Sequence, residues 1–215
     1  MRSLSLLLAL SLLASAGYTQ PAAPPASDAD GQGVSVSDEL LAHRRSAIAQ
    51  LVSGPRAPLD SLTARGLRYY PPNDTFRVST VVLPLPDTGA VAFATSDGAT
   101  KLYRAYARVF FRLRGTLHGV TVFAPQGAAR NPFLRDRLFL PIRDATSGFG
   151  SYGGGRYLDV SRRAVDAGTL TLDFNRAYNP WCAYADGYSC PVPPPENELA
   201  IAIRAGEADY ARGGQ

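Results

Sequence analysis

The stretch KLYRAYARVFFRLRGTLHGVTVF, residues 101–123, fits two secondary structures, and the choice between them decides the fold. A helical stripe comprises Leu102, Ala105, Tyr106, Val109, Phe110 and Leu113. A strand-like alternation places arginines between Tyr103, Ala105, Ala107, Val109, Phe111 and Leu113. The turn signals Asp97-Gly98 and Arg114-Gly115 bracket the first half, and residues 116–123 are again rich in β-branched and aromatic residues. This bracketing favours an antiparallel meander, so we predict strands at 101–114 and 116–123.

Outward from the meander, the sequence predicts one helix and further short strands. Ser37 is a suitable helix cap, Asp38 and Glu39 are acids in the first turn, and Gly54-Pro55 is a stop signal, which together predict a helix of about four turns. Runs rich in Val, Thr and Phe predict strands at 77–83, 90–95, 137–142, 155–160, 169–174 and 200–203. The expected fold class is mainly β, an antiparallel β-barrel or sandwich with one N-terminal α-helix.

The first 36 residues differ in composition from the rest of the chain. Residues 1–16 combine Arg2, an apolar stretch at 4–13 that is too short to span a bilayer, and the small residues Ala14-Ser15-Ala16, as a secretory signal peptide does. Residues 17–36, rich in Pro, Ala, Gly and Asp, predict a flexible linker, and residues 37–210 a single β-rich domain. We expect a soluble secreted or periplasmic protein with no membrane span after cleavage.

The composition excludes several classes of chemistry. Of 22 basic residues only Lys101 is a lysine, so no P-loop is present. The chain has two histidines, His43 and His118, and neither a G-x-S-x-G nor an H-E-x-x-H motif, which argues against serine hydrolases and zinc proteases. No D-x-D-x-D-G calcium loop exists, although several Asp residues are available. We predict no metal and no cofactor.

The two cysteines, Cys182 and Cys190, are eight residues apart. In an oxidising compartment this spacing predicts one local disulfide that closes a small loop. A metal pair is the alternative, but two thiols without a neighbouring histidine make only half a zinc site.

Several motifs resemble a bacterial family known as domain-of-unknown-function family 1684. They are GLRYYPP at 66–72, RDATSG at 143–148, YGGGRYL at 152–158, a long stretch from Leu172 to Pro191, PPPEN at 193–197 and RAGE at 204–207. The resemblance covers residues 37–207, nearly the whole mature chain. The family has no established activity, so the resemblance implies a lineage and a candidate site, not a reaction.

Polar residues of these motifs are the candidate site. Asp173 and Asn175 are two apart on a predicted strand and are expected on one face. We expect them to converge with loop residues in a pocket, the candidates being Asp144, Ser147, Tyr152, Arg156, Tyr178, Asn179, Glu196 and Asn197. The hypothesis is a non-catalytic envelope module that binds a small polar or carbohydrate-like ligand. The alternatives are a hydrolase or isomerase with Asp173 and Glu196 as its acid/base pair, and polar staples that satisfy loop backbone.

The residues GFGSYG at 148–153 fit the dinucleotide pattern G-x-G-x-x-G. Nucleotide binding by this pattern requires a helix directly after it, and here Gly154 and Gly155 lead into a predicted strand. We interpret residues 148–155 as a mobile loop over the polar pocket.

Charge is unevenly distributed along the chain. Residues 101–163 carry a net charge of +9 and residues 164–215 a net charge of −4. Arginines interleaved with aromatic residues resemble a single-strand nucleic-acid surface, but an exported protein rarely meets nucleic acid, so we expect no such partner. The functional alternative is an acidic envelope polymer or a purely structural partner. The simpler expectation is that the acidic end of the chain neutralises the basic segment.

Overall fold

A computed structural model describes residues 36–87, 89–132 and 134–212, which all belong to one compact unit, Val34–Gln215. The predicted signal peptide and all of the predicted linker except Val36 lie outside the described residues. Within the described ranges, no helix is long and apolar enough to cross a membrane.

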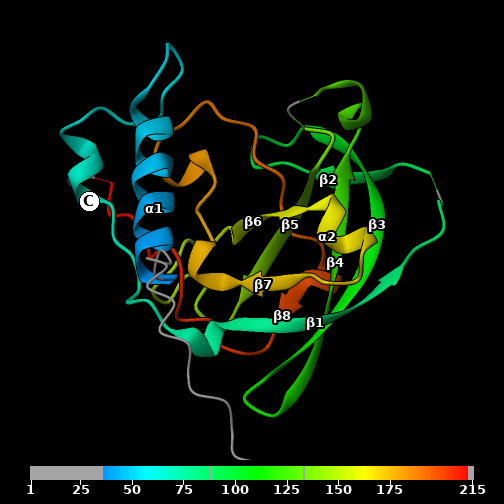
Figure 1. Ribbon diagram of the computed structural model, residues 1–215. Helices are drawn as coiled ribbons and strands as arrows, with labels where there is room; N and C mark the ends of the chain where they lie inside the picture. The colour runs from blue at the N-terminus through cyan, green and yellow to red at the C-terminus, as the bar shows by residue number, and fades with distance from the viewer. Residues whose placement is uncertain (1–35, 88, 133, 213–215) are drawn as a thin grey trace, which may run out of the picture. The chain divides into compact units, whose positions relative to one another are not determined.

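Eight strands of the described residues form one sheet in the order β6-β5-β4-β3-β1-β7, with β2 paired to β3 and β8 to β5 (Figure 1). The strands are β1 (Arg77–Pro84), β2 (Val91–Ala94), β3 (Thr100–Leu113), β4 (Thr116–Pro125), β5 (Arg137–Asp144), β6 (Arg156–Ser161), β7 (Thr171–Asp173) and β8 (Glu198–Leu199). The sheet curls into a nearly closed barrel whose two end strands are β6 and β7. All of its pairings are antiparallel except that of β5 with β8, so the predicted mainly antiparallel β class is confirmed.

The meander of β3 and β4 confirms the strand interpretation of residues 101–123. Ala107, Val109, Phe111 and Leu113 are buried in the barrel, and the residues between them are more exposed. The helical stripe fails because the turns at both ends pair the segment with its neighbours along its length. Arg114 and Gly115 close the β3–β4 hairpin with positive φ values of 50° and 83°, as a two-residue turn of type I′ requires.

The helices are α1 (Val36–Val52), which confirms the predicted N-terminal helix, and α2 (Arg162–Asp166). Short 3₁₀ turns occur at η1 (Thr63–Gly66), η2 (Asp74–Phe76), η3 (Ala128–Arg130), η4 (Phe174–Arg176), η5 (Trp181–Ala183) and η6 (Pro195–Asn197). These turns are too short for periodicity to reveal them in the sequence.

Of the predicted strands, one was wrong in its bounds and another does not form. The strand expected at 169–174 ends at Asp173, because the Asp173 carboxylate accepts from the main-chain N–H of Asn175 and caps the turn η4. No strand forms at 200–203. There the main-chain N–H of Ile203 donates to the Asp144 carboxylate at 2.6 Å, and its carbonyl accepts from Arg156 at 2.8 Å, in place of a strand ladder. The parallel strand β8 lies just before this segment.

The helix α1 stands beside the sheet where β6 and β7 leave it unclosed. The barrel interior is filled by aliphatic and aromatic residues of the long strands, among them Val109, Phe111 and Leu140. A separate cluster beneath α1 contains Leu51 and Tyr184. His43 of α1 lines a cavity together with residues of β6 and β7, which places the helix beside the gap between the two end strands.

Candidate functional site

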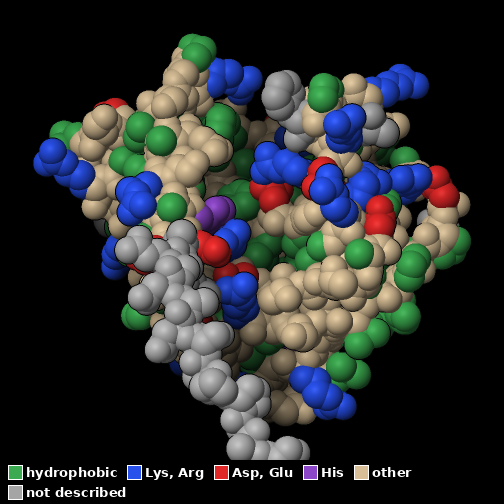
Figure 2. Space-filling model, in the orientation of Figure 1, with side chains coloured by type: hydrophobic (Ala, Val, Ile, Leu, Met, Phe, Trp, Pro, Cys, Tyr) green, Lys and Arg blue, Asp and Glu red, His purple; other side chains and the backbone are tan. Residues whose placement is uncertain are grey.

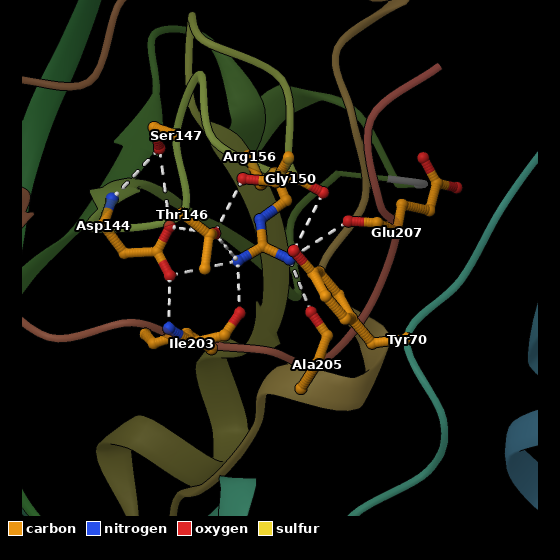
Figure 3. Close-up of polar contacts among 10 residues, drawn as sticks. Tyr70, Asp144, Thr146, Ser147, Gly150, Arg156, Ile203, Ala205 and Glu207 are labelled. Carbon is orange, nitrogen blue, oxygen red and sulfur yellow. Dashed lines mark hydrogen bonds and ion pairs between the residues drawn. The ribbon is translucent and has the colours of Figure 1, made fainter. Parts of the chain in front are cut away.

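Two of the predicted site residues, Arg156 and Asp144, form a buried ion pair (Figure 3). We call such a buried polar group, whose hydrogen bonds tie separate segments of the chain together, a staple. Arg156 is 1% exposed, and its guanidinium donates to the main-chain carbonyls of Ile203, Ala205 and Glu207. It also donates to the Asp144 carboxylate at 3.2 Å. Because these bonds tie β6 to the C-terminal segment within the interior, Arg156 holds the chain together, and its guanidinium is engaged by main-chain carbonyls and by Asp144.

The Asp144 carboxylate has its own set of donors. It accepts from the hydroxyl of Thr146 at 2.7 Å and from the N–H of Ile203, and the Ser147 hydroxyl lies 3.4 Å away. Ser147 also accepts from the main-chain N–H of Asp144 at 3.1 Å. The structure thus brings Asp144, Ser147 and Arg156, which were expected to line a pocket, into one buried group of hydrogen bonds, and their geometry is that of a polar staple.

Asn197 and Asn175 are staples as well. Asn197 is 0% exposed and bridges β4 and β5, since its amide donates to the carbonyls of Thr121 and Pro141 and accepts from the Thr121 N–H. The Asn175 amide accepts from the N–H of Asn73 and donates to its carbonyl, and it also donates to Asp173.

The expected acid/base pair shares neither a contact nor a cavity within the described residues. Asp173 lies at the end of β7, where its carboxylate accepts from Asn175 and lies 3.7 Å from Arg176. The side chain of Glu196 is exposed in the turn η6, and its main-chain carbonyl lies at 3.5 Å from Arg108. The prediction that Asp173 and Asn175 sit on one strand was wrong, because the strand ends between them.

The glycine-rich loop at 148–155 contributes no residue to the cavities described here. Its carbonyl at Gly150 accepts from the Tyr70 hydroxyl at 2.8 Å and from the N–H of Asp209 at 3.0 Å. Tyr152 packs against the cluster beneath α1. The loop is thus fastened to two other segments of the chain, and it does not lie over the pocket as expected.

The cavity that suits a ligand lies between α1 and the sheet, and we call it the α1 cleft. Its volume is about 260 Å³, and an adjoining cavity of about 300 Å³ shares four of its lining residues. Figure 2 shows a hollow beside α1 with basic and acidic side chains around it. The residues of the cleft that matter most here are His43, Arg44, Ala47, Tyr69, Arg137, Asp159, Asn175, Arg176, Tyr178, Asn179, Trp181, Tyr184 and Glu207.

Four aromatic side chains line the α1 cleft: Tyr69, Tyr178, Trp181 and Tyr184. Trp181 and Tyr184 belong to the segment that begins the loop between Cys182 and Cys190, whose sulfur atoms lie 2.11 Å apart, at disulfide distance. Trp181 packs edge-on against Tyr188 of the same loop, with ring centroids 5.2 Å apart. The cysteine loop therefore positions part of the aromatic wall.

Glu207 is the buried carboxylate of the cleft, with only 2% of the residue exposed. It accepts from the hydroxyls of Tyr69 and Tyr184 and from the main-chain N–H of Asn179 at 2.8 Å. Burial raises the pKa of Glu207, although these donors favour its charged form. Burial, and then the neighbouring Glu207 charge, raises the pKa of both tyrosines. The cluster fixes the orientation of two aromatic walls.

Basic side chains surround the cleft. Arg137 pairs with Asp159, and Arg176 lies 3.6 Å from Glu39. The guanidinium of Arg44 lies 4.4 Å above the ring of Tyr69. Burial, and then the charge of Arg176, lowers the pKa of His43.

Two polar atoms of the cleft residues are buried without a hydrogen-bond partner within the described part of the chain, Asn179 Oδ1 and Arg44 Nε. Buried polar atoms are almost always paired, so an unpaired acceptor and an unpaired donor on two residues that line one cavity suggest that a polar ligand pairs with them there. Of the predicted candidates, the structure brings Asn175, Tyr178 and Asn179 to this cleft.

Sequence reasoning missed the other cleft residues. His43 and Arg44 were not among the predicted site residues, because nothing in the sequence of α1 shows which segment covers it. Tyr69 and Glu207 lie inside the motifs GLRYYPP and RAGE, so the motifs themselves were the available signal. A bridge between Tyr69 and Glu207 joins these motifs across 138 residues.

The basic segment is not neutralised by the acidic end of the chain as expected. Among the described residues, one ion pair joins the two, Arg143 with Glu198 at 3.5 Å. Within the acidic end itself, Asp173 lies near Arg176 and Asp186 pairs with Arg212.

Comparison with known proteins places the chain. It is similar to an uncharacterised protein of Haloarcula marismortui known from a solution NMR structure, with 32% sequence identity and a TM-score of 0.62. The match covers 80% of this chain and 93% of that one. None of the curated proteins matches. Residues 63–208 match the family model described as Protein of unknown function (DUF1684), and since this is more than half of the chain, the protein belongs to that family, as its motifs indicated.

Proposed function

We propose that the protein is an exported, non-catalytic binding module that holds a small polar, carbohydrate-like ligand in the α1 cleft. The observation that carries the proposal is the cleft itself, a cavity of about 260 Å³ that is lined by four aromatic side chains and by Asn179, whose buried Oδ1 has no hydrogen-bond partner among the described residues. Ligand pockets combine apolar walls with a few fixed polar groups in this way.

The chemistry of a sugar matches these walls. The C–H face of a pyranose ring packs on aromatic side chains, and its hydroxyls need donors and acceptors at fixed positions. Tyr69 and Tyr184 are held by Glu207, so these two walls are ordered before a ligand arrives. Preordered walls reduce the entropy lost on binding.

Binding without turnover is favoured by how the carboxylates of the cleft are engaged. Glu207 accepts from two tyrosines and a main-chain amide, and Asp159 pairs with Arg137 and accepts from Tyr178 at 3.2 Å. A general acid or base must reach the substrate proton directly or through one water. Both carboxylates thus already accept from side chains or main chain of the cleft, and among the described residues Asp173 and Glu196 have no contact with each other.

Export rests on the predicted signal peptide and the cysteine pair at disulfide distance. Expression of the full chain with its leader in a bacterial host tests it. We expect the protein in the periplasmic fraction, with Gly17 as its first residue on N-terminal sequencing and both cysteines oxidised. A protein retained with Met1 and free thiols would contradict export.

Binding is tested by calorimetric titration of neutral and acidic monosaccharides and disaccharides into the oxidised protein. Ala47→Trp fills the cleft from α1, and Ala42→Trp, on an exposed position of the same helix, is the matched control. We expect at least one sugar to bind wild type and Ala42→Trp but not Ala47→Trp, and to be recovered chemically unchanged. If Ala47→Trp left binding unchanged, the ligand would not bind in the α1 cleft. If the sugar were recovered chemically altered, the protein would be an enzyme.

A further inference from the structure

We infer, on the basis of the proposed function, that the ligand is an acidic sugar of the uronic-acid class, with its carboxylate on Arg44 and a hydroxyl on Asn179. These two residues line the same cavity, and each has a buried polar atom without a partner in the described part of the chain.

The charge of the cleft carries the first step. Among the described residues, Arg137 and Arg176 each lie near carboxylates, whereas Arg44 has no carboxylate within ion-pair distance. The carboxylates that face the cleft, Asp159 and Glu207, are already engaged by Arg137 and by tyrosines. Among the described residues, Arg44 is therefore the arginine of the cleft without an ion-pair partner, so its guanidinium can bind an anion.

Arg44 is also held in place. One terminal nitrogen donates to the main-chain carbonyl of Tyr70 at 3.0 Å, and the guanidinium stacks on the ring of Tyr69 at 4.4 Å. Its Nε has no hydrogen-bond partner among the residues that the structure describes. A guanidinium fixed in this way presents its remaining donors in one plane, which suits the planar carboxylate group.

Asn179 requires a hydrogen-bond donor from the ligand, whereas Arg44 requires an anionic acceptor. The residue is 2% exposed, its amide nitrogen donates to the carbonyl of Ala208 at 2.9 Å, and its main-chain N–H donates to Glu207. These bonds leave Oδ1 as an acceptor that needs a donor, so a hydroxyl fits there and a second carboxylate does not. The ligand that fits the cleft therefore carries one anionic group and one hydroxyl on a ring that packs against aromatic side chains.

The test is calorimetric titration of the matched pairs D-glucose and D-glucuronate, and D-galactose and D-galacturonate. We expect at least one acid to bind wild type about tenfold or more tightly than its neutral partner, and this preference to shrink at high salt. Arg44→Met should remove the preference and Arg44→Lys should retain part of it. The exposed Arg45→Met, on the same helix and outside the cleft, should change nothing.

Asn179→Ala should weaken the acid and its neutral partner alike, by about tenfold, because both place a hydroxyl on Oδ1. Thermal unfolding of each variant verifies that it is folded at the titration temperature. Equal affinity for an acid and its neutral partner would overturn the inference and leave the proposed function standing. Failure of every sugar to bind wild type would overturn both.

Discussion

Arg156 and Glu207 are joined back to back. The Arg156 guanidinium donates to the main-chain carbonyl of Glu207 at 3.1 Å, while the Glu207 carboxylate points away from Arg156 (Figure 3). On that side the carboxylate accepts from Tyr69 and Tyr184 in the α1 cleft. The buried staple and the cleft therefore meet in one residue. Through it, the arginine of the motif YGGGRYL fixes the segment on which the walls of the cleft depend.

The staple predicts a large effect of Arg156→Met on stability. The variant leaves the Asp144 carboxylate and three main-chain carbonyls buried with fewer donors. We expect the free energy of unfolding to fall by about 3–5 kcal/mol, the usual result of breaking a buried ion pair from one side. Urea unfolding measures this change.

Arg143→Met is the matched control, because the Arg143 side chain is 42% exposed and pairs with Glu198 at 3.5 Å on the surface. It should change the free energy of unfolding by no more than about 0.5 kcal/mol. If Arg156→Met and Arg143→Met lowered the free energy of unfolding equally, the burial of the Arg156 ion pair would not be the cause of the effect.

Asn197 and Asn179 should separate structural residues from binding residues. Asn197→Ala leaves two carbonyls and one N–H of β4 and β5 without their partner, so we expect a loss of about 2–4 kcal/mol. The affinity of the folded variant for a cleft ligand should stay at the wild-type value. Chemical unfolding and titration on the same samples measure the two effects. A weakened affinity with unchanged stability would instead make Asn197 a ligand contact.

The sequence was sufficient for the fold because alternation of Ala107, Val109, Phe111 and Leu113 is a local property of one strand. It was insufficient for the site because Asn197 and Asn179 look alike in sequence. One of them bridges two strands and the other lines a cavity, and that difference depends on segments far away in the chain. The motif residues were expected in one pocket, and the structure divides them between the staple and the cleft, a division that depends on the packing of α1 and of the C-terminal segment.

The buried Glu207 predicts a specific pH dependence of stability. Its pKa is raised above the ordinary value of 4.5 in the folded protein, mainly by burial. Between pH 4.5 and the pKa in the folded protein, the folded state keeps a proton that the unfolded state has lost. The contribution of this proton to the free energy of unfolding is complete below pH 4.5. It is lost as pH rises through the folded pKa, by at most about 1.4 kcal/mol per pH unit.

Glu207→Gln isolates this contribution, since the amide keeps an acceptor for Tyr184 and does not titrate. We expect the difference in free energy of unfolding between wild type and Glu207→Gln to favour the wild type increasingly as pH falls toward 4.5. Urea unfolding across this range, at constant ionic strength, measures it. A difference independent of pH would show that the carboxyl has the same pKa in both states.

Gly155 is expected to be intolerant of any side chain. Its φ is +90°, and an added Cβ would lie 2.5 Å from the main-chain oxygen of Ile142. Gly155→Ala should cost at least about 3 kcal/mol from backbone strain and overlap. Gly153→Ala, in the same loop, would meet only ordinary contacts at 3.7 Å and should stay within about 0.5 kcal/mol. Equal tolerance at both positions would point to a loop that rearranges freely.

The disulfide of the cysteine loop is expected to affect both the stability of the fold and the affinity of the cleft. Closing nine residues between Cys182 and Cys190 restricts the unfolded chain, which predicts about 2–3 kcal/mol of stability on the chain-entropy model. In urea unfolding, the double variant Cys182→Ser, Cys190→Ser should be less stable than wild type by this amount, and a thiol reductant should not change its stability. The stability of wild type should fall toward that of the double variant when the disulfide is reduced.

The same variant tests the cleft. Trp181 directly precedes the cysteine loop, Tyr184 lies in it, and both line the cleft, so the folded double variant should also bind a cleft ligand more weakly. Retention of full affinity would mean that the packing of Tyr184 against Tyr210 and Glu207 alone holds the aromatic wall in place.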